Sequence, residues 1–412
     1  MSVPAPPTGW EFRVRRVEGA PLVAVRAWLR GGARAEAVPG QCYLTGRLLA
    51  EGTRRRDWRT LAEATESHGM VLTGTSGFET HAVALDALAG DWALALDWLA
   101  EILLEPAFPA DRAALLCRQA RAELASLADQ ADATTARAFL DQLYSPHPRG
   151  RPLQGTEESL AILTPEHAAE HHRRALGWGG VLTVAGLIDE AAVAERLAGL
   201  AAALPAGGGP PPEPPAPPAT PVARREIVTR GHDQAHLFLG RLTVDQDDPE
   251  LPALALLGIV LGAGSGLAGR IPTRIREREG LAYAATAETA AGAARDRGRL
   301  VCYLGTSPAT LSRAEAAVRE ELARLVAEGP TPAEVEEARS HLLGREPFRR
   351  ETARQWANLL ATAALTGKPV DDPAWVIARL RGVTHSEVAA ACRYLDPSAL
   401  AGRPTVTARA DG

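Results

Sequence analysis

An arginine and a tyrosine in the second half of the chain have the clearest potential for chemistry. They are the first and the last residue of the stretch Arg276-Glu-Arg-Glu-Gly-Leu-Ala-Tyr283, which follows shortly after a glycine-rich segment. Arginine supplies a permanent charge and a fork of N–H donors, and tyrosine supplies a hydroxyl. Converging side chains of these types can hold a peptide carbonyl or a carboxylate. Neither can cut a peptide at neutral pH, and taken alone the stretch also fits a solvated charged face beside a half-buried tyrosine.

A second candidate is His167-Ala-Ala-Glu170-His171, which reads as the H-x-x-E-H motif of one class of zinc peptidases. On a helix, His167 and His171 share a face and can bind zinc, and Glu170 can deprotonate a zinc-bound water. The order of charges, with His171 and His172 toward the C-terminal side, instead suits the helix dipole. No third ligand follows on a well-placed helix, so a chance match is favoured.

The glycine-rich segment Gly264-Ser-Gly266-Leu-Ala-Gly269 formally matches G-x-G-x-x-G. A dinucleotide site needs a strand before these glycines and a helix after them. The preceding run, Pro252–Leu261, reads as a helix, so nucleotide binding is disfavoured. We interpret the segment as a turn that lines a cleft, where Gly264 and Gly266 let the backbone approach a peptide.

The composition excludes several classes of protein. The chain has 412 residues with a formal net charge of -5, which gives no reason to expect nucleic acid or a membrane as partner. Its four cysteines form no C-x-x-C pair, so neither disulfides nor a cysteine zinc site is expected. The N-terminus lacks the pattern of a secretory signal, and no apolar run could span a bilayer. These features predict a cytoplasmic protein.

Proline and glycine mark a linker at residues 206–221. It separates an N-terminal domain, 1–205, from a C-terminal domain, 222–412. Both halves begin with a β-rich run and later contain a helix, a proline-marked turn and another helix. The predicted strands are Leu22–Arg30 and Gln234–Gly240, and the predicted helix pairs are Asp91–Leu104 with Asp111–Ala128 and Leu311–Ala327 with Ala333–Leu343. The fold class is therefore α+β, with two tandem related domains, each a sheet with helices on one face.

The ordered motifs of the second half resemble the insulinase/pitrilysin-type zinc peptidases, in the branch that contains the processing peptidases. The matching stretches are Gln234-Ala-His-Leu-Phe-Leu-Gly240, Asp248-Pro-Glu250, the Gly262–Gly269 loop, Ile275–Tyr283, Gly298–Thr306 and Glu328–Ala338. The resemblance implies that the two domains form half of a clamshell. It also implies that Arg276 and Tyr283 contact substrate beside a zinc ion, together with the loop that contains Gly264 and Gly266.

In such families the zinc motif lies in the first helix, inside a Gly-x-x-H-x-x-E-H frame. This chain keeps the frame from Gly40 to Thr53, but Tyr43 and Arg47 fill the histidine slots and Gly46 fills the slot of the catalytic glutamate. The distal acidic ligand matches Glu123 within one residue. One ligand cannot hold zinc, so the resemblance implies no metal and no catalytic residue in this chain's own zinc site. We also expect an Arg47–Glu123 ion pair, since a lone buried carboxylate is costly.

The resemblance implies a non-catalytic, substrate-binding subunit of a heterodimeric zinc endopeptidase. A homologous H-x-x-E-H subunit would hold the zinc, and this chain would supply Arg276 and Tyr283 to a peptide substrate. No peptidase activity is expected of the chain alone. Two alternatives stay open: a structural or peptide-binding protein of the same fold, and a self-sufficient peptidase that uses His167, Glu170 and His171. Whether the chain alone forms a homodimer is also open.

Overall fold

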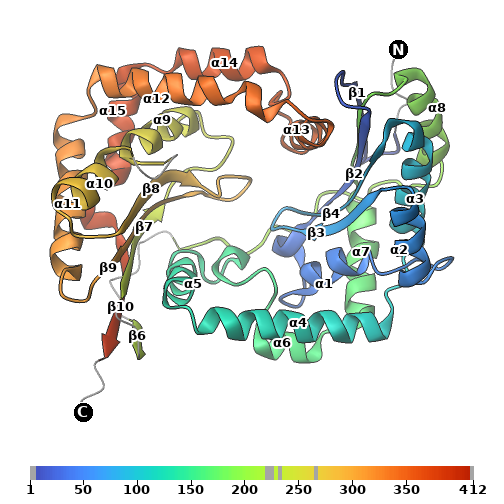
Figure 1. Cartoon of the computed structure of the whole chain (residues 1–412), viewed down its shortest axis with the longest axis horizontal. Helices are drawn as coiled ribbons and strands as arrows, with labels where there is room; N and C mark the ends of the chain where they lie inside the picture. The colour runs from blue at the N-terminus through green and yellow to red at the C-terminus, as the bar shows by residue number, and fades with distance from the viewer. Residues whose placement is uncertain (1–5, 219–226, 231–233, 264–267, 409–412) are drawn as a thin grey trace. The chain divides into compact units, whose positions relative to one another are not determined.

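Two five-stranded sheets organise the chain, each in its own compact unit (Figure 1). The computed structural model describes residues 6–218, 227–230, 234–263 and 268–408. The first unit comprises Met1–Leu124, Arg151–Pro215 and Glu346–Pro373, and the second comprises Ala125–Gly150, Ala216–Arg345 and Ala374–Gly412.

The two sheets have the same topology. The first contains β1 (Glu11–Arg16), β2 (Leu22–Arg30), β3 (Val71–Ser76), β4 (Thr80–Leu88) and β5 (Gly180–Gly186), in the order β1-β5-β2-β4-β3. The second contains β6 (Ile227–Arg230), β7 (Ala235–Leu242), β8 (Ala284–Ala291), β9 (Arg299–Thr306) and β10 (Ala401–Ala408), in the order β6-β10-β7-β9-β8. In each sheet the first pair of this order is parallel and the other pairs are antiparallel. This match confirms two related α+β domains.

Helices cover the sheets, and the amphipathic ones lie where their periodicity predicts. The first half of the sequence contributes α1 (Gln41–Leu48), α2 (Trp58–Ser67), α3 (Trp92–Leu104), α4 (Ala110–Ala128), α5 (Ala131–Tyr144), α6 (Glu157–Ile162), α7 (Pro165–Trp178) and α8 (Glu190–Ala201). The second half contributes α9 (Leu251–Leu261), α10 (Arg270–Pro272), the π-helix η4 (Thr273–Arg278), α11 (Leu311–Glu328), α12 (Pro332–Arg345), α13 (Ala353–Thr366), α14 (Pro373–Gly382) and α15 (His385–Ala391). The predicted helices match α3, α4, α11 and α12 within two residues at each end.

Each half of the sequence gives one helix to the sheet of the other half. α13 packs on the first sheet, where Trp356 and Leu360 contact Ala24 and Ala185. α5 packs on the second sheet, where Phe139 and its neighbours contact strands β7 and β10. Alternate residues of β2 face the main core instead, among them Val23 and Val25, so α13 covers the opposite face of that sheet.

Because of these two helices, the compact units of the structure do not coincide with the predicted domains. The predicted domains 1–205 and 222–412 each follow one continuous half of the sequence, whereas each compact unit also contains a segment from the other half. Within the described ranges, no helix is both long enough and apolar enough to cross a lipid bilayer.

Candidate functional site

Helix α1 carries the positions at which a zinc motif would lie, and it offers no zinc ligand there. Tyr43 is half-buried and Arg47 is exposed. The guanidinium carbon of Arg47 lies 5.7 Å from the centre of the Tyr43 ring, a cation–π distance. Burial raises the pKa of Tyr43, and the Glu123 carboxylate adds to that rise. A phenol and a guanidinium therefore replace the two imidazoles.

The predicted Arg47–Glu123 ion pair is wrong. Among the described residues, no nitrogen of Arg47 lies within 4.0 Å of a Glu123 carboxylate oxygen. Both side chains are exposed. The prediction assumed a buried carboxylate, which needs a compensating charge, whereas water solvates an exposed one at little cost.

The slot of the catalytic glutamate has no room for a side chain. A Cβ atom at Gly46 would lie 2.4 Å from the carbonyl oxygen of Thr75 in β3. From the other side, a Cβ atom at Gly74 would lie 2.0 Å from the carbonyl oxygen of Gly46. Helix α1 and strand β3 thus meet backbone to backbone where a catalytic glutamate would project. The residues at Tyr43, Gly46, Arg47 and Glu123 do not fit a zinc ion.

The predicted Arg276–Tyr283 pair, in contrast, is exposed. Arg276 lies on η4, and within the described part of the chain it forms no ion pair and no side-chain hydrogen bond. Tyr283 lies just before β8 and is 48% exposed. Its hydroxyl donates a hydrogen bond to Oε1 of Gln234 at 2.8 Å. No hydrogen bond joins Arg276 and Tyr283 themselves. The Arg276 guanidinium is open to an outside ligand, whereas the Tyr283 hydroxyl can donate to one only if it turns away from Gln234.

Several polar residues around Tyr283 were not predicted from the sequence to belong to the site. Nδ1 of His236 and the hydroxyl of Tyr303 are 3.1 Å apart, and their rings stack. Burial, then the neighbouring Tyr283 and Asp132, raises the pKa of Tyr303 to about 12. Burial, then Asp132, also raises the pKa of Tyr283, which stays a neutral donor at physiological pH. His236 on β7 and Tyr303 on β9 are diagonal neighbours, since Gly305 lies opposite His236 and Phe238 lies opposite Tyr303.

Of the glycine-rich loop, Gly264 and Gly266 lie outside the described residues. The two ends of the loop do meet. A Cβ atom at Gly269 would lie 2.5 Å from Cα of Gly262, and both residues have positive φ angles of 106° and 136°. Glycine is therefore required at both ends of the loop, because any side chain there would push them apart.

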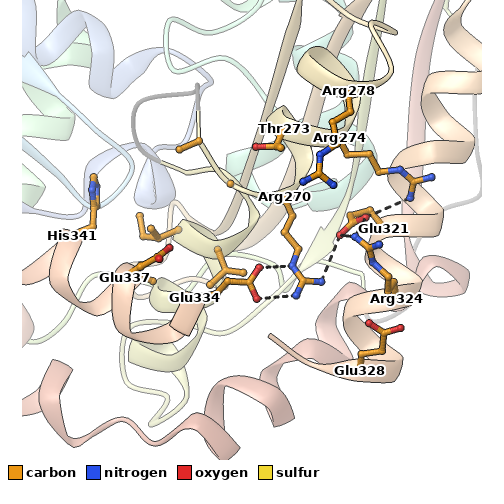
Figure 2. Close-up of a pocket in the computed structure, with 15 residues that line it drawn as sticks. Arg270, Thr273, Arg274, Arg278, Glu321, Arg324, Glu328, Glu334, Glu337 and His341 are labelled. Carbon is orange, nitrogen blue, oxygen red and sulfur yellow. Dashed lines mark hydrogen bonds and ion pairs between the residues drawn. The ribbon is translucent and has the colours of Figure 1, made fainter. Parts of the chain in front are cut away.

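A network of ion pairs holds the segment that carries Arg276 (Figure 2). Arg270 donates to both oxygens of Glu334, at 2.7 and 2.8 Å, and lies 3.5 Å from Glu321. Arg274 donates to Glu279 at 2.7 Å, just past the end of η4. A cavity of about 580 Å³ lies beside these residues, lined by parts of α9 to α12. The paired charges fix α10 and η4 against α11 and α12, and so position the Arg276 backbone.

Comparisons with known proteins agree on one family. Residues 14–157 match the family described as Insulinase (Peptidase family M16), and residues 181–342 match the Peptidase M16 inactive domain. Together the two segments cover most of the chain. The chain belongs to the insulinase, or M16, peptidase family.

Relatives in the M16 family differ in how they are described. An uncharacterized zinc protease of Mycobacterium bovis is 28% identical over 380 residues, which are 90% of this chain and 85% of that protein. A Helicobacter pylori protein described as Non-peptidase homolog YmxG is 23% identical over 361 residues, 85% of this chain and 80% of that protein. A peptidase M16 inactive domain from Pseudomonas fluorescens superposes with a TM-score of 0.87 at 22% identity, covering 99% of this chain and 98% of that chain.

Two observations indicate that the chain has no catalytic zinc site of its own: the match to the family's inactive domain and the altered residues of α1. This M16 protein is a non-catalytic member of the family, since Tyr43 and Arg47 replace the two zinc-binding histidines and Gly46 replaces the catalytic glutamate.

The literal H-x-x-E-H match does not form a site in this M16 protein. Nδ1 of His167 accepts a hydrogen bond from the Thr164 N–H at 3.2 Å and completes the cap of α7. Glu170 is exposed and pairs with Arg173 at 2.6 Å. His171 is fully buried. The side chains of His167, Glu170 and His171 therefore lie in different environments and do not converge on one site.

The expected dipole role of the two later histidines is also wrong. Burial lowers the pKa of His171 to about 3 and that of His172 to about 4, so both are neutral at physiological pH. Neutral rings inside the unit cannot complement a helix dipole.

Glu334→Gln should reduce stability and flatten its dependence on pH. The hydrogen bonds from Arg270 hold the pKa of Glu334 at about 2, below the usual 4.5. This carboxylate therefore stabilises the folded state above about pH 4.5, and the contribution is lost as the pH falls toward 2. We expect a loss of about 1 kcal/mol at pH 7, with less change between pH 4.5 and 2, measured by urea unfolding. Glu337→Gln, on the same helix, is the matched control.

Proposed function

We propose that this chain is the non-catalytic, substrate-binding subunit of a heterodimeric zinc endopeptidase. Its partner would be a homologous subunit that carries an intact H-x-x-E-H motif and holds the zinc. The observation that carries the proposal is the contrast between the zinc position on α1 and the Arg276–Tyr283 pair. Helix α1 has neither of the two zinc-binding histidines and no room for the catalytic glutamate, whereas Arg276 and Tyr283 are exposed on a fixed segment.

In this proposal the two chains form the halves of a clamshell around a peptide. Arg276 and Tyr283 would donate hydrogen bonds to the carbonyl next to the scissile bond and stabilise negative charge that develops on its oxygen. Tyr283 suits this role because a tyrosine hydroxyl is protonated at neutral pH, and it would turn from Gln234 to the carbonyl oxygen. The loop that contains Gly264 and Gly266 would contact the peptide backbone. We further propose a cytoplasmic location, which the four free cysteines favour.

The test compares the chain alone with the chain mixed with such a homologue. The lone chain should leave a peptide library intact, and the mixture should cleave peptides in a reaction that chelators stop. Cleavage by the lone chain that a chelator abolishes would contradict the proposal. Size measurements by sedimentation on the same samples would separate a heterodimer from a homodimer.

The description of the Helicobacter pylori relative as a non-peptidase homolog favours one alternative, a structural or peptide-binding protein of the same fold without protease activity. Peptide binding by the lone chain, without cleavage in any mixture with H-x-x-E-H homologues, would support that alternative instead.

A further inference from the structure

Three buried side chains with metal-binding atoms converge inside the first unit. Cys42 on α1, His81 on β4 and His171 on α7 each offer one ligand atom, and these atoms lie within 4.8 Å of one another. All three residues are 0% exposed. One sulfur and two imidazole nitrogens are a donor set that zinc and copper favour.

The ring of His171 is the first sign that the cluster is a ligand site. Neither of its ring nitrogens has a hydrogen-bond partner in the described structure, although both are fully buried. Buried polar atoms without partners are rare, because each costs on the order of 1–3 kcal/mol. A metal ion bound to one nitrogen would remove much of that cost.

A chain of hydrogen bonds prepares His81 as a ligand. Nε2 of His172 lies 2.8 Å from the carbonyl oxygen of Leu103, so this nitrogen carries the proton and donates it. Nδ1 of His172 is then an acceptor, and Nε2 of His81, 3.4 Å away, is the donor to it. The remaining Nδ1 of His81 is left with a free lone pair and no partner. Metal-binding histidines are oriented in this way, through the nitrogen that does not bind the metal.

The Cys42 thiolate supplies the negative charge that faces the cation. Glu36 is next to the cluster, where one carboxylate oxygen accepts a hydrogen bond from the backbone N–H of Cys42 at 3.1 Å and the other lies 3.4 Å from Nη2 of Arg151. Arg151 already balances the charge of Glu36, so Glu36 orients the backbone of Cys42 rather than neutralising the metal ion.

We propose that Cys42, His81 and His171 bind one Zn²⁺ ion inside the first unit. The Cys42 thiol releases its proton to solvent as the zinc–sulfur bond forms, and each histidine donates one lone pair. Three protein ligands leave a fourth tetrahedral position for a water molecule. Because the ligands are buried, the ion enters as the chain folds and stabilises the folded state.

This site differs from the zinc position of the family. Cys42 lies next to Tyr43 on α1, but its side chain points into the core, whereas Arg47 and Glu123 are exposed. No metal was expected in this chain because the zinc motif is lost at Tyr43, Gly46 and Arg47, and the spacing of the four cysteines gave no sign of a cysteine zinc site. The fold, however, brings a cysteine to two histidines that no short motif connects.

The test is metal analysis of the full chain, expressed with zinc in the medium. We expect roughly one zinc per chain, lost in Cys42→Ala and in His171→Leu, which replaces a buried polar ring by an apolar side chain. Cys117→Ala and Glu123→Gln are the matched controls, and both should keep the metal. Zinc lost in Glu123→Gln, zinc kept in Cys42→Ala, no zinc, or copper in its place would each overturn the proposal.

A second measurement does not depend on whether the variants fold. The unsubstituted chain expressed with cobalt should show a thiolate-to-cobalt charge-transfer band in the near ultraviolet. A cobalt-loaded chain without that band would show that Cys42 is not a ligand.

Discussion

Phenylalanine in place of Tyr283 should lower peptide cleavage by the paired enzyme on the order of 10²–10³-fold. Arg276→Ala should have an effect of the same order. Each change removes a donor that is expected to bind the substrate oxygen more tightly as it becomes negative, so kcat should fall more than KM rises. The measurement is steady-state cleavage of one peptide by the mixture of the two subunits.

Matched controls separate this role from stability. Arg278→Ala removes an exposed arginine from the same π-helix, and Tyr394→Phe removes a hydroxyl elsewhere in the second unit. Both should leave cleavage nearly unchanged. If Tyr283→Phe and Arg276→Ala cleave peptides as the unsubstituted pair does, these residues do not contact the reacting carbonyl.

The position of the Tyr283 ring can be tested independently. A Cβ atom at Gly305 in β9 would lie 2.8 Å from atoms of this ring. Because the ring is half-exposed, Gly305→Ala should displace it outward rather than unfold the sheet. Cleavage should then fall toward the level of Tyr283→Phe, with little change in the midpoint of thermal unfolding.

Gly46→Ala should destabilise the chain by about 3 kcal/mol. The added methyl group would lie 2.4 Å from the Thr75 carbonyl oxygen, a backbone atom that cannot move without shifting β3. Urea unfolding followed by circular dichroism measures the loss. Gly199→Ala is the control, because this glycine in α8 has nothing within 4 Å of the added atom. That change should stabilise the chain by up to about 1 kcal/mol.

The same contact predicts that the zinc motif cannot simply be restored. The triple variant Tyr43→His, Gly46→Glu, Arg47→His would regain the side chains but would force a glutamate into the backbone of β3. We expect it to be less stable than the double variant that keeps Gly46. A triple variant that is as stable as the unsubstituted chain and cleaves peptides in a chelator-sensitive way would contradict the close contact.

Features of the fold that depend on local patterns could be predicted from the sequence. The apolar periodicity of α3 and α11 fixed their bounds, because burying one helix face requires that spacing. The degenerate zinc slots at Tyr43 and Arg47 could also be found, since the surrounding frame is short and continuous.

Features of the fold that depend on long-range contacts could not be predicted from the sequence. The sequence gives no sign that α13 packs on the first sheet, because its apolar face fits any sheet of suitable shape. The burial of Glu123 was misjudged, since exposure depends on which elements cover a helix. His81 and His171 approach Cys42 only through the tertiary fold, so no spacing rule could have joined them.

The packing of α13 on the first sheet has a consequence for synthesis on the ribosome. After α8 is made, about 165 more residues must be added before α13 is complete, which takes roughly 8–33 s at about 5–20 residues per second. During that interval the face of the sheet with Ala24 and Ala185 has no cover. The nascent N-terminal half should therefore need a chaperone. A gene divided at the linker should yield two insoluble products when they are expressed separately and a soluble complex when they are expressed together.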